Sequence, residues 1–219
     1  MSSDPAKSRV YEAIGRVAAA LGSAARLQIL EFVAQGERSV DALAAMAGLS
    51  VANTSKHLQA LRQSGLVNAR KEGLRVYYSL AGDDVSLLLS SLRGVAEHRA
   101  ADVEKLLRAW LAHRDELDPV PAREVLSRMK SGLVTVLDVR PVEEFAAGHL
   151  PGAINVPVER LESYLAKLPR RKEVVAYCRG PYCLMSFEAV EKLRKRGFKA
   201  KRLENGFPEW RAAGLPVER

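Results

Sequence analysis

Two cysteines are the residues of this sequence best suited to nucleophilic chemistry. Cys178 and Cys183 are its only cysteines, and both lie in the segment AYCRGPYCL, 176–184. A thiolate is a strong nucleophile, and its pKa falls beside an arginine such as Arg179 or at a helix N-terminus. Cysteines this close could carry sulfur or close a disulfide, whereas structural zinc usually takes four ligands. The segment therefore predicts a reactive thiol site.

Composition and the apolar segments indicate a cytoplasmic protein. Hydrophobic residues make up 47% and charged residues 27% of the 219 residues, as in globular chains of one large or two ordinary domains. The N-terminus, MSSDPAKSRV, lacks the apolar run of a secretory signal, and the most apolar stretch, 85–92, is too short to span a bilayer. We therefore expect no membrane partner. Because the cytoplasm keeps thiols reduced, close cysteines there are more often reactive than structural.

The positive charge of the chain is unevenly distributed. The formal net charge is +8, and residues 119–219 hold 19 Lys and Arg against 12 Asp and Glu. Residues 50–80 hold five basic side chains and one acidic side chain. Such a segment can attract a phosphate backbone, or it can be a solvated face with no partner.

The chain is expected to divide near its middle. A long apolar-periodic stretch that starts at Asp83 ends in HRDELDPVPARE, 113–124, where Pro119 and Pro121 disfavour helix. The expected parts are a first domain over 1–114, a linker over 115–121 and a second domain over 122–219.

The first domain is predicted to be mainly helical. Apolar residues recur at helical spacing over 10–21, 23–34 and 40–47. Ser23 and Ser39 are placed to cap two of these helices, and a further helix ends at Gly65. The next segment alternates like two strands joined at Glu72-Gly73, which indicates a hairpin. Helix, turn, helix and a two-stranded wing are typical of DNA-binding domains.

Residues 49–80, LSVANTSKHLQALRQSGLVNARKEGLRVYYSL, closely resemble the recognition helix and wing of ArsR-type winged-helix repressors. The matching residues are Ser55, His57-Leu58, Leu61-Arg62, Gly65-Leu66-Val67 and the wing pattern Arg-x-x-Gly-x-x-Val-Tyr-Tyr-x-Leu. The resemblance implies a homodimer, with the first and fifth helices at the interface, that binds an inverted-repeat operator in double-stranded DNA.

The side chains expected to contact DNA follow from the core face of the fourth helix. If Leu58 and Leu61 point inward, the polar residues between them point outward, where amide side chains can pair with adenine edges. Basic residues of the helix end and the wing suit phosphates. His57 could instead pack and donate one structural hydrogen bond. The expected DNA contacts are Asn53, Ser55, Lys56, His57, Gln59, Arg62, Lys71 and Arg75.

Metal binding is not expected. Many ArsR-type proteins sense metals through cysteines near the third helix or through Asp, His and Glu ligands on the fifth. Here the segment SVDALAAMAGLS, 39–50, has no cysteine, and His98 has only Asp102 and Glu104 nearby. We expect neither metal nor cofactor, and the signal should enter through the second domain.

The second domain is predicted to be α/β with a parallel sheet. Helical segments alternate with the strand-like runs LVTVLDV, 133–139, EVVAYC, 173–178, and KAKRLEN, 199–205. In such sheets, chemistry gathers at the carboxyl ends of the strands. Cys178 lies at one of these ends.

Two further segments of this half strongly resemble rhodanese-type sulfurtransferase domains. They are DVRPVEEFAAGHLPGAINVP, 138–157, and the closing segment LENGFPEWRAAGLPV, 203–217. Cys178 lies between them, where those domains carry the catalytic cysteine. The resemblance implies that Cys178 attacks the outer sulfur of thiosulfate or a persulfide and becomes a persulfide itself. Arg179 would favour anionic donors.

Other residues are expected to support the pocket, and the loop itself differs from the usual rhodanese pattern. Asp138, Arg140 and His149 match the first signature, and we expect them to support the pocket, pairing with loops such as that of Glu144. Gly180 and Tyr182 belong to the loop itself. Pro181 removes one N–H from the expected cradle, which puts fast thiosulfate turnover in doubt. Cys183 could resolve a persulfide on Cys178, or it could be a small packing residue.

Three functions remain open at this point. The first is a transcriptional repressor that senses thiosulfate, persulfide or polysulfide through Cys178, with or without Cys183. The second is an active sulfurtransferase with an attached DNA-binding domain. The third is a repressor that responds to arsenite or another thiophile through the same two thiols.

Overall fold

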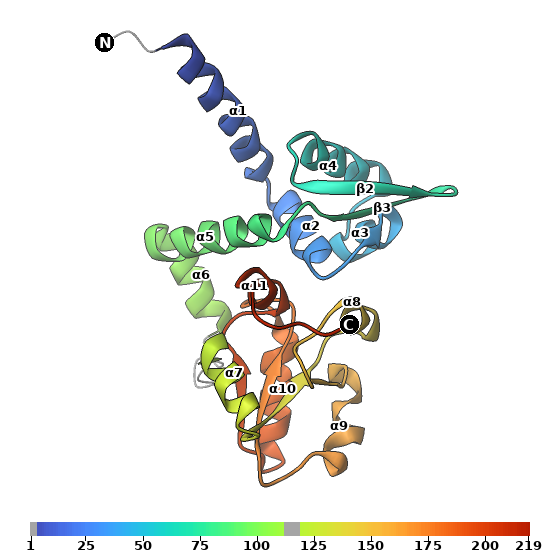
Figure 1. Ribbon diagram of the computed structural model, residues 1–219, viewed down its shortest axis with the longest axis vertical. Coiled ribbons are helices and arrows are strands. Elements are labelled where there is room, and N and C mark those ends of the chain that lie inside the picture. Colours follow the sequence, from blue (N-terminus) through green and yellow to red (C-terminus); the bar gives the residue numbers. More distant parts are fainter. Residues whose placement is uncertain (1–3, 112–118) are drawn as a thin grey trace. The chain divides into compact units, whose positions relative to one another are not determined.

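The computed structural model describes residues 4–111 and 119–219 and divides into two compact units. The first unit is Met1–Val85 and the second is Ser86–Arg219. Figure 1 labels the helices and strands of both units. The expected fold classes are both confirmed: a helical winged helix-turn-helix comes first, and an α/β sheet domain follows.

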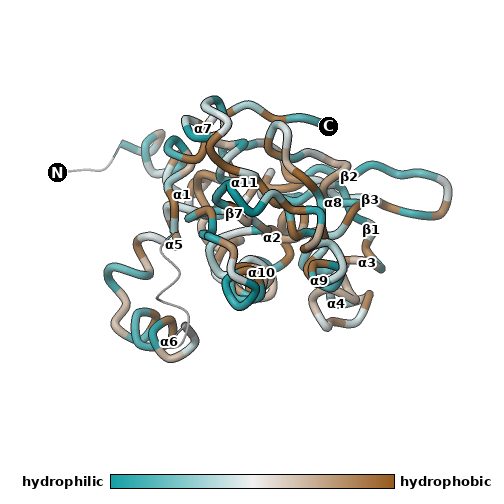
Figure 2. Tube along the Cα trace, turned by 90° about the horizontal axis from the view of Figure 1, so that it is seen from below, coloured by the Kyte–Doolittle hydropathy of each residue, from teal (hydrophilic) through white to brown (hydrophobic). Residues whose placement is uncertain are grey.

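The first unit consists of four helices and a small antiparallel sheet of strand order β1-β3-β2. Its helices are α1 (Pro5–Leu21), α2 (Ala24–Ala34), α3 (Val40–Ala47) and α4 (Val51–Gln63). Its strands are β1 (Arg38–Ser39), β2 (Val67–Glu72) and β3 (Arg75–Leu80). The β2–β3 hairpin is the wing, and it extends from the rest of the unit in Figure 2.

Local sequence signals explain where these elements begin and end. The Ser39 hydroxyl accepts a hydrogen bond from the Ala42 N–H and caps α3, as expected. Ser23 precedes α2 but makes no capping bond, whereas Ser50, which was not predicted as a cap, caps α4 by accepting a hydrogen bond from the Asn53 N–H. Gly65 adopts a φ of 72° after α4, a left-handed conformation that favours glycine.

The apolar stretch after the wing forms two helices rather than one. They are α5 (Asp83–Arg99), which begins in the first unit and ends in the second, and α6 (Ala101–Leu111). Asp102 and Glu104 therefore lie on a different helix from His98. Within the described ranges, no single helix is long and apolar enough to cross a bilayer; α1 and α2 reach that length and hydropathy only together, across an 86° bend.

The second unit contains a five-stranded sheet of order β4-β8-β7-β5-β6, in which all pairings are parallel. Its strands are β4 (Pro119–Val120), β5 (Val134–Asp138), β6 (Ile154–Asn155), β7 (Glu173–Tyr177) and β8 (Ala200–Leu203). Its helices are α7 (Ala122–Lys130), α8 (Val142–Ala147), η1 (Val158–Arg160), α9 (Leu161–Tyr164), η2 (Leu165–Lys167), α10 (Leu184–Lys195) and α11 (Phe207–Ala212).

Both faces of this sheet are covered, which explains its nearly continuous apolar strands. Alternate residues of β5 and β7 point to opposite faces. Leu137 and Ala176 pack with α10 and with the short helices after β6, whereas Val136 and Val175 pack with α7 and α11. The carboxyl ends of β5 and β7 lie side by side, since Asp138 pairs with Tyr177.

The second domain begins earlier than the expected linker allowed. Pro119 and Val120, placed in the linker from the sequence, form β4 and pair with β8, and Val120 is 2% exposed. Pro119 stands at the start of an edge strand, a position that proline tolerates. Residues 115–118 of the expected linker lie outside the described residues.

Candidate thiol site and nucleic-acid interface

The thiol loop, residues 178–183, connects the carboxyl end of β7 to the N-terminus of α10. Cys178 directly follows β7, and Cys183 is the residue that precedes the first turn of α10. The Cys183 N–H donates to the Gly180 carbonyl at 3.2 Å, so the loop curls back on itself. Both cysteines are free thiols.

Cys178 is enclosed among apolar residues and oxygen atoms. It is 1% exposed and belongs to the core on the α10 face of the sheet. Its sulfur lies 3.4 Å from the Cys183 carbonyl oxygen and 3.3 Å from the Ser186 hydroxyl. Burial raises the pKa of Cys178 well above its ordinary value, and the hydrogen bond to Cys183 and the charge of Cys183 raise it further. Burial thus disfavours the Cys178 thiolate.

Cys183 has the opposite character. It is half-buried, and its pKa falls to about 7 because the Cys178 thiol donates a hydrogen bond to it, which outweighs the effect of burial. The backbone N–H groups of Arg179 and Met185 and the charge of Arg179 lower it further. Backbone N–H groups thus favour negative charge at both sulfurs, that of Gly180 at Cys178 and those of Arg179 and Met185 at Cys183.

Arg179 is tied to the body of the domain. Its guanidinium donates to both carboxylate oxygens of Glu144, with Nη2 at 2.7 Å, and Glu144 is 1% exposed. From the sequence, Glu144 was expected beside Asp138 and Arg140. It lies close to Arg140, and it also holds the thiol loop through its ion pair with Arg179. The Arg179 charge available to an anionic donor is thus partly neutralised.

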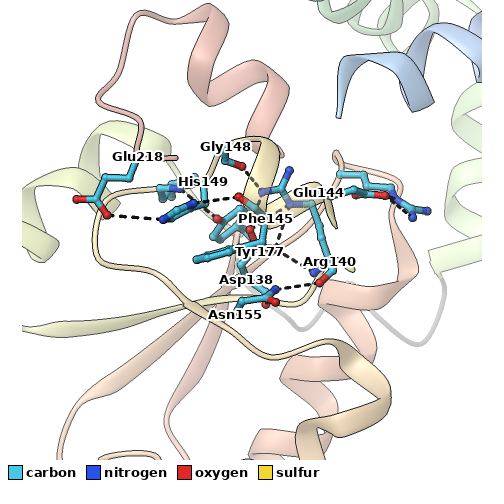
Figure 3. A network of polar contacts seen from close by, with 11 residues as sticks. Asp138, Arg140, Glu144, Phe145, Gly148, His149, Asn155, Tyr177 and Glu218 are labelled. Atoms are coloured by element: carbon cyan, nitrogen blue, oxygen red, sulfur yellow. Dashed lines mark hydrogen bonds and ion pairs between the residues drawn. The ribbon is translucent and has the colours of Figure 1, made fainter. Parts of the chain in front are cut away.

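Asp138 and Arg140 form a fully buried ion pair at the end of β5 (Figure 3). Arg140 Nη2 lies 2.6 Å from the Asp138 carboxylate and also donates to the Gly148 carbonyl at 2.8 Å. The Asn155 amide donates to the carbonyls of both residues, and the Tyr177 hydroxyl accepts from the Leu150 N–H. This network fastens three loops at one sheet edge, which agrees with a supporting role.

In Figure 3, His149 lies to the left of Asp138 and Arg140, on the side away from Glu144. Its ring stacks on Phe145 with a centroid distance of 3.7 Å, and its Nδ1 lies 3.0 Å from the Phe145 carbonyl oxygen. Its Nε2 lies 3.7 Å from the Glu218 carboxylate. These contacts hold α8 against the end of the chain and do not involve the cysteines.

Gly206 holds the thiol loop from its other side. A Cβ atom on Gly206 would lie 2.4 Å from the Arg179 carbonyl carbon and from the Gly180 nitrogen. The next residue, Phe207, donates its N–H to the Cys178 carbonyl at 3.1 Å. Only glycine leaves room for this close approach.

Tyr182 joins the thiol loop to α5 and α6 within the second unit. Its hydroxyl donates to the Glu97 carboxylate on α5, and its ring meets Trp110 of α6 edge to face, with centroids 6.2 Å apart. Arg93 of α5 forms an ion pair with Glu209 of α11. A cavity of about 400 Å³ lies beside these contacts.

Several residues of the thiol site were missed from the sequence. The residues that hold the loop or the network without having been singled out are Arg93, Glu97, Trp110, Asn155, Tyr177, Ser186, Gly206 and Glu209. Gly206 offered the one signal available, a glycine inside the closing signature. The partners on α5 are more than 80 positions from the loop and left no local pattern.

The expected DNA-contact residues lie on the outer surface of the first unit. Leu58 and Leu61 are fully buried, so the opposite face of α4 is open, as predicted. Lys71 and Arg75 are exposed on the wing. The exposed residues of α4 among the predicted set are Asn53, Lys56, Gln59 and Arg62, and the half-buried ones are Ser55 and His57.

One basic residue of this segment is already paired. Arg70 forms ion pairs with Glu37 and Glu72, both at 2.6 Å. The pKa of Glu37 is lowered by the hydrogen bond from Arg70. Arg70 therefore adds less to the attraction of DNA than its neighbours Lys71 and Arg75.

Within residues 4–111 and 119–219, no group of three or more His, Cys, Asp or Glu side chains could hold a metal ion. His98 hydrogen-bonds through Nδ1 to the Gly94 carbonyl on its own helix, at 2.6 Å.

Each half of the chain matches a known protein family. Residues 23–69 match the model of the bacterial regulatory protein arsR family, and residues 121–213 match the rhodanese-like domain. The HTH-type transcriptional regulator Rv0324 of Mycobacterium tuberculosis is 45% identical over 212 residues, which cover 97% of this chain and 93% of that protein. A sulfurtransferase of Allochromatium vinosum is 29% identical over 85 residues, covering 38% of this chain and 78% of that protein.

A solved structure resembles the first half. The homodimeric winged helix-turn-helix domain of Mb0332 from Mycobacterium bovis is 40% identical and covers 47% of this chain and 94% of that one, with a TM-score of 0.42.

Proposed function

Because the chain belongs to the arsR family of bacterial regulatory proteins and carries a rhodanese-like domain, we propose that it is a repressor that leaves its operator when the thiol loop takes up sulfur. The observation that carries this proposal is the pair of free thiols in one loop, together with the hydrogen bond from the Tyr182 hydroxyl of that loop to Glu97 of α5. The regulator works in the cytoplasm, where its DNA is.

DNA recognition rests on α4 and the wing. The exposed Asn53 and Gln59 can pair with adenine edges in the major groove, and the basic residues of α4 and the wing can contact phosphates. Binding should be measured by fluorescence polarisation with the promoter region of its own gene and with a random duplex. Equal affinity for both duplexes would contradict operator recognition.

Exposed apolar side chains support a homodimer. The helix α1 buries only Ala20 and Leu21 at its C-terminal end. The large apolar residues exposed on α1 are Val10, Tyr11 and Ile14, and those on α5 are Leu87, Leu88, Leu92 and Val95. Surfaces of this kind mark protein–protein contacts. A dimer of this chain would place two copies of α4 on the two half-sites of an inverted repeat.

Sulfur uptake rests on the chemistry of the loop. A cysteine thiolate attacks the outer sulfur of thiosulfate or of a persulfide, and sulfite or a thiol leaves while the cysteine becomes a persulfide. The pKa of Cys183, about 7, makes a thiolate available at neutral pH. Uptake lengthens one side chain inside a curled loop that has little free space around Cys178.

The path from the loop to the DNA-binding half is α5. Tyr182 lies between the two cysteines and is bonded to Glu97. If the loop rearranges on sulfur uptake, the hydrogen bond between Tyr182 and Glu97 would be strained or broken. Allosteric coupling of this kind typically amounts to about 1–3 kcal/mol, or roughly 5- to 150-fold in affinity.

The test compares operator binding before and after treatment with polysulfide. Wild-type protein should lose affinity, and the Cys178→Ser, Cys183→Ser double variant should bind equally with and without polysulfide. Reversal by dithiothreitol separates sulfur uptake from damage. Release of the double variant to the same extent as wild type would overturn the proposal.

A sulfurtransferase activity is the second candidate, favoured by the match to the rhodanese-like domain over residues 121–213. The enclosed Cys178 and the position of Pro181 in the loop argue against fast turnover. Thiocyanate production from thiosulfate and cyanide, above that of the double variant, would establish the activity. An arsenite arm of the DNA-binding assay tests the thiophile alternative: release by arsenite alone would favour it.

A further inference from the structure

The end of the sheet opposite the thiol loop carries a dense group of basic side chains. Residues 166–172 and 192–202 hold four and seven Lys or Arg residues, respectively, and no Asp or Glu. The first segment directly precedes β7, and the second covers the end of α10, the loop after it and most of β8. Seven of these side chains are exposed and are here called the basic face: Lys167, Arg170, Arg171, Lys172, Lys195, Arg196 and Lys199.

Contacts between the two segments bring these charges onto one surface. The Arg170 guanidinium donates to the Arg196 carbonyl at 3.2 Å and lies over the Phe198 ring, 4.9 Å from its centroid. The Val174 N–H donates to the Lys199 carbonyl at 2.8 Å, which holds the two segments side by side. Phe198 is itself buried in the core of the domain, so the basic face stands on a packed base.

Acidic side chains neutralise little of this charge. Lys195 pairs with Glu191, and Arg196 pairs with Glu162. The side chains of both pairs are well exposed, so water and salt screen their attraction. Within residues 4–111 and 119–219, the other five side chains of the basic face form no ion pair. A group of like charges with so few counter-charges creates a positive potential that attracts a polyanion.

We propose that the basic face binds the phosphate backbone of double-stranded DNA. Duplex DNA carries one negative charge per about 1.7 Å of its axis, which complements a surface of several closely spaced cations. The first half of the chain belongs to the arsR family of regulators. DNA bound by that half raises the concentration of phosphates around the second half of the same chain. These contacts would be independent of sequence and would add to recognition by α4 and the wing.

The basic face is separate from the thiol loop, so this proposal does not depend on the proposed sulfur response. Lys172 lies just before β7 and Cys178 lies just after it. A strand of five residues spans about 15 Å. Substitutions on the basic face should therefore leave the surroundings of both cysteines unchanged.

The experiment measures how salt weakens DNA binding by the full-length protein, without polysulfide. The basic-face variant is Arg171→Gln, Lys199→Gln, which removes two exposed cations that form no ion pair. The matched control is Arg123→Gln, Arg219→Gln, which removes two exposed cations outside the basic face. Both double variants change the net charge equally. Fluorescence polarisation over a salt series gives their affinities for the operator region and for a random duplex.

The slope of log affinity against log salt should fall by about 1–2 in the basic-face variant, because each lost phosphate contact lowers it by about 0.9. Its affinities for the two duplexes should fall by the same factor, since phosphate contacts carry no sequence information. The control should keep the wild-type slope. An unchanged slope in the basic-face variant would overturn the proposal. Equal loss of slope in both variants would also overturn it, because overall charge would then explain the effect.

An anionic membrane surface is the other polyanion that such a face could meet. Co-sedimentation with vesicles of phosphatidylglycerol and phosphatidylcholine tests this for wild type and both double variants. Vesicle binding that is lost in the basic-face variant, beside an unchanged DNA slope, would replace DNA by a membrane as the partner. A lower DNA slope in that variant alone supports the proposal whether or not vesicles bind. If no protein responds to polysulfide, the sulfur proposal fails and this one stands.

Discussion

The pH response of the thiol loop is set at the scale of single residues by Cys183. Its pKa is lowered to about 7, so its thiolate is present above that pH and is lost as the pH falls through it. We predict that alkylation of Cys183 in the wild-type protein falls roughly tenfold between pH 8 and pH 6. An ordinary cysteine would instead keep gaining reactivity above pH 8, since its pKa is about 8.5. Stopped samples analysed by mass spectrometry measure this, and an ordinary profile would contradict it.

The buried pair at the end of β5 should dominate the stability of the second unit. Asp138 and Arg140 are both 0% exposed, so removing one partner leaves an uncompensated buried charge. We predict that Asp138→Ala lowers the free energy of unfolding by about 3–5 kcal/mol. The matched control is Glu162→Ala, which breaks the exposed pair with Arg196 and should change stability by at most about 1 kcal/mol. Urea unfolding measures both, and equal effects would contradict the prediction.

Residues differ in how much of their role the sequence could predict. Cys178 was placed at the end of a strand because a short apolar run followed by a loop is a local pattern. The pairing of Arg179 with Glu144 joins positions 35 residues apart, and the choice among Asp138, Glu144 and two arginines depends on packing. The protonation of the two thiols depends on which N–H groups the loop turns inward, which spacing alone does not specify.

At the scale of elements, Tyr182 connects the thiol loop to α5, the helix that begins in the first unit. We predict that Tyr182→Phe, which keeps the ring beside Trp110 and removes the bond to Glu97, takes up sulfur at the wild-type rate. Its operator affinity should change less on polysulfide treatment than that of wild type, because the loop has lost its polar contact with α5. The matched control is Tyr164→Phe, outside the loop. A wild-type response in Tyr182→Phe would show that this contact does not transmit the signal.

The wing offers a second comparison between neighbouring residues. Lys71 is exposed and has a neighbour, Arg70, whose guanidinium is paired with Glu37 and Glu72. We predict that Lys71→Ala weakens binding to operator and random duplex alike and lowers the slope of log affinity against log salt by about 1. Arg70→Ala should change the slope less. Fluorescence polarisation over a salt series measures this, and equal slopes would contradict it.

Elements were predicted with uneven success, for physical reasons. The helices α2, α3 and α4 and the strands β5 and β7 have strong periodicity or apolar runs, and they lie close to where the sequence placed them. The helix expected before β7 is instead one turn of α-helix between two short 3₁₀ segments. Pro119 and Val120 look like a linker by composition. They form β4 because pairing with β8 supplies hydrogen bonds that the sequence does not reveal.

At the scale of the whole molecule, the proposed binding to an inverted repeat requires a second copy of the chain. Ile14 on α1 is 57% exposed, in a helix that buries almost none of its length. We predict that Ile14→Lys shifts the protein from dimer to monomer, because a charge at the centre of an apolar contact must be desolvated for association. The monomer should lose affinity for an inverted repeat far more than for a single half-site.

The control for this change is Leu74→Lys at the tip of the wing. Leu74 is fully exposed, and a lysine there should leave the oligomeric state unchanged. Light scattering after size-exclusion chromatography measures both variants, and circular dichroism verifies that both are folded. A dimeric Ile14→Lys protein with normal operator binding would mean that α1 does not form the interface. If the monomer still takes up sulfur, the thiol loop works within one chain. Only the response of DNA binding would then require the dimer.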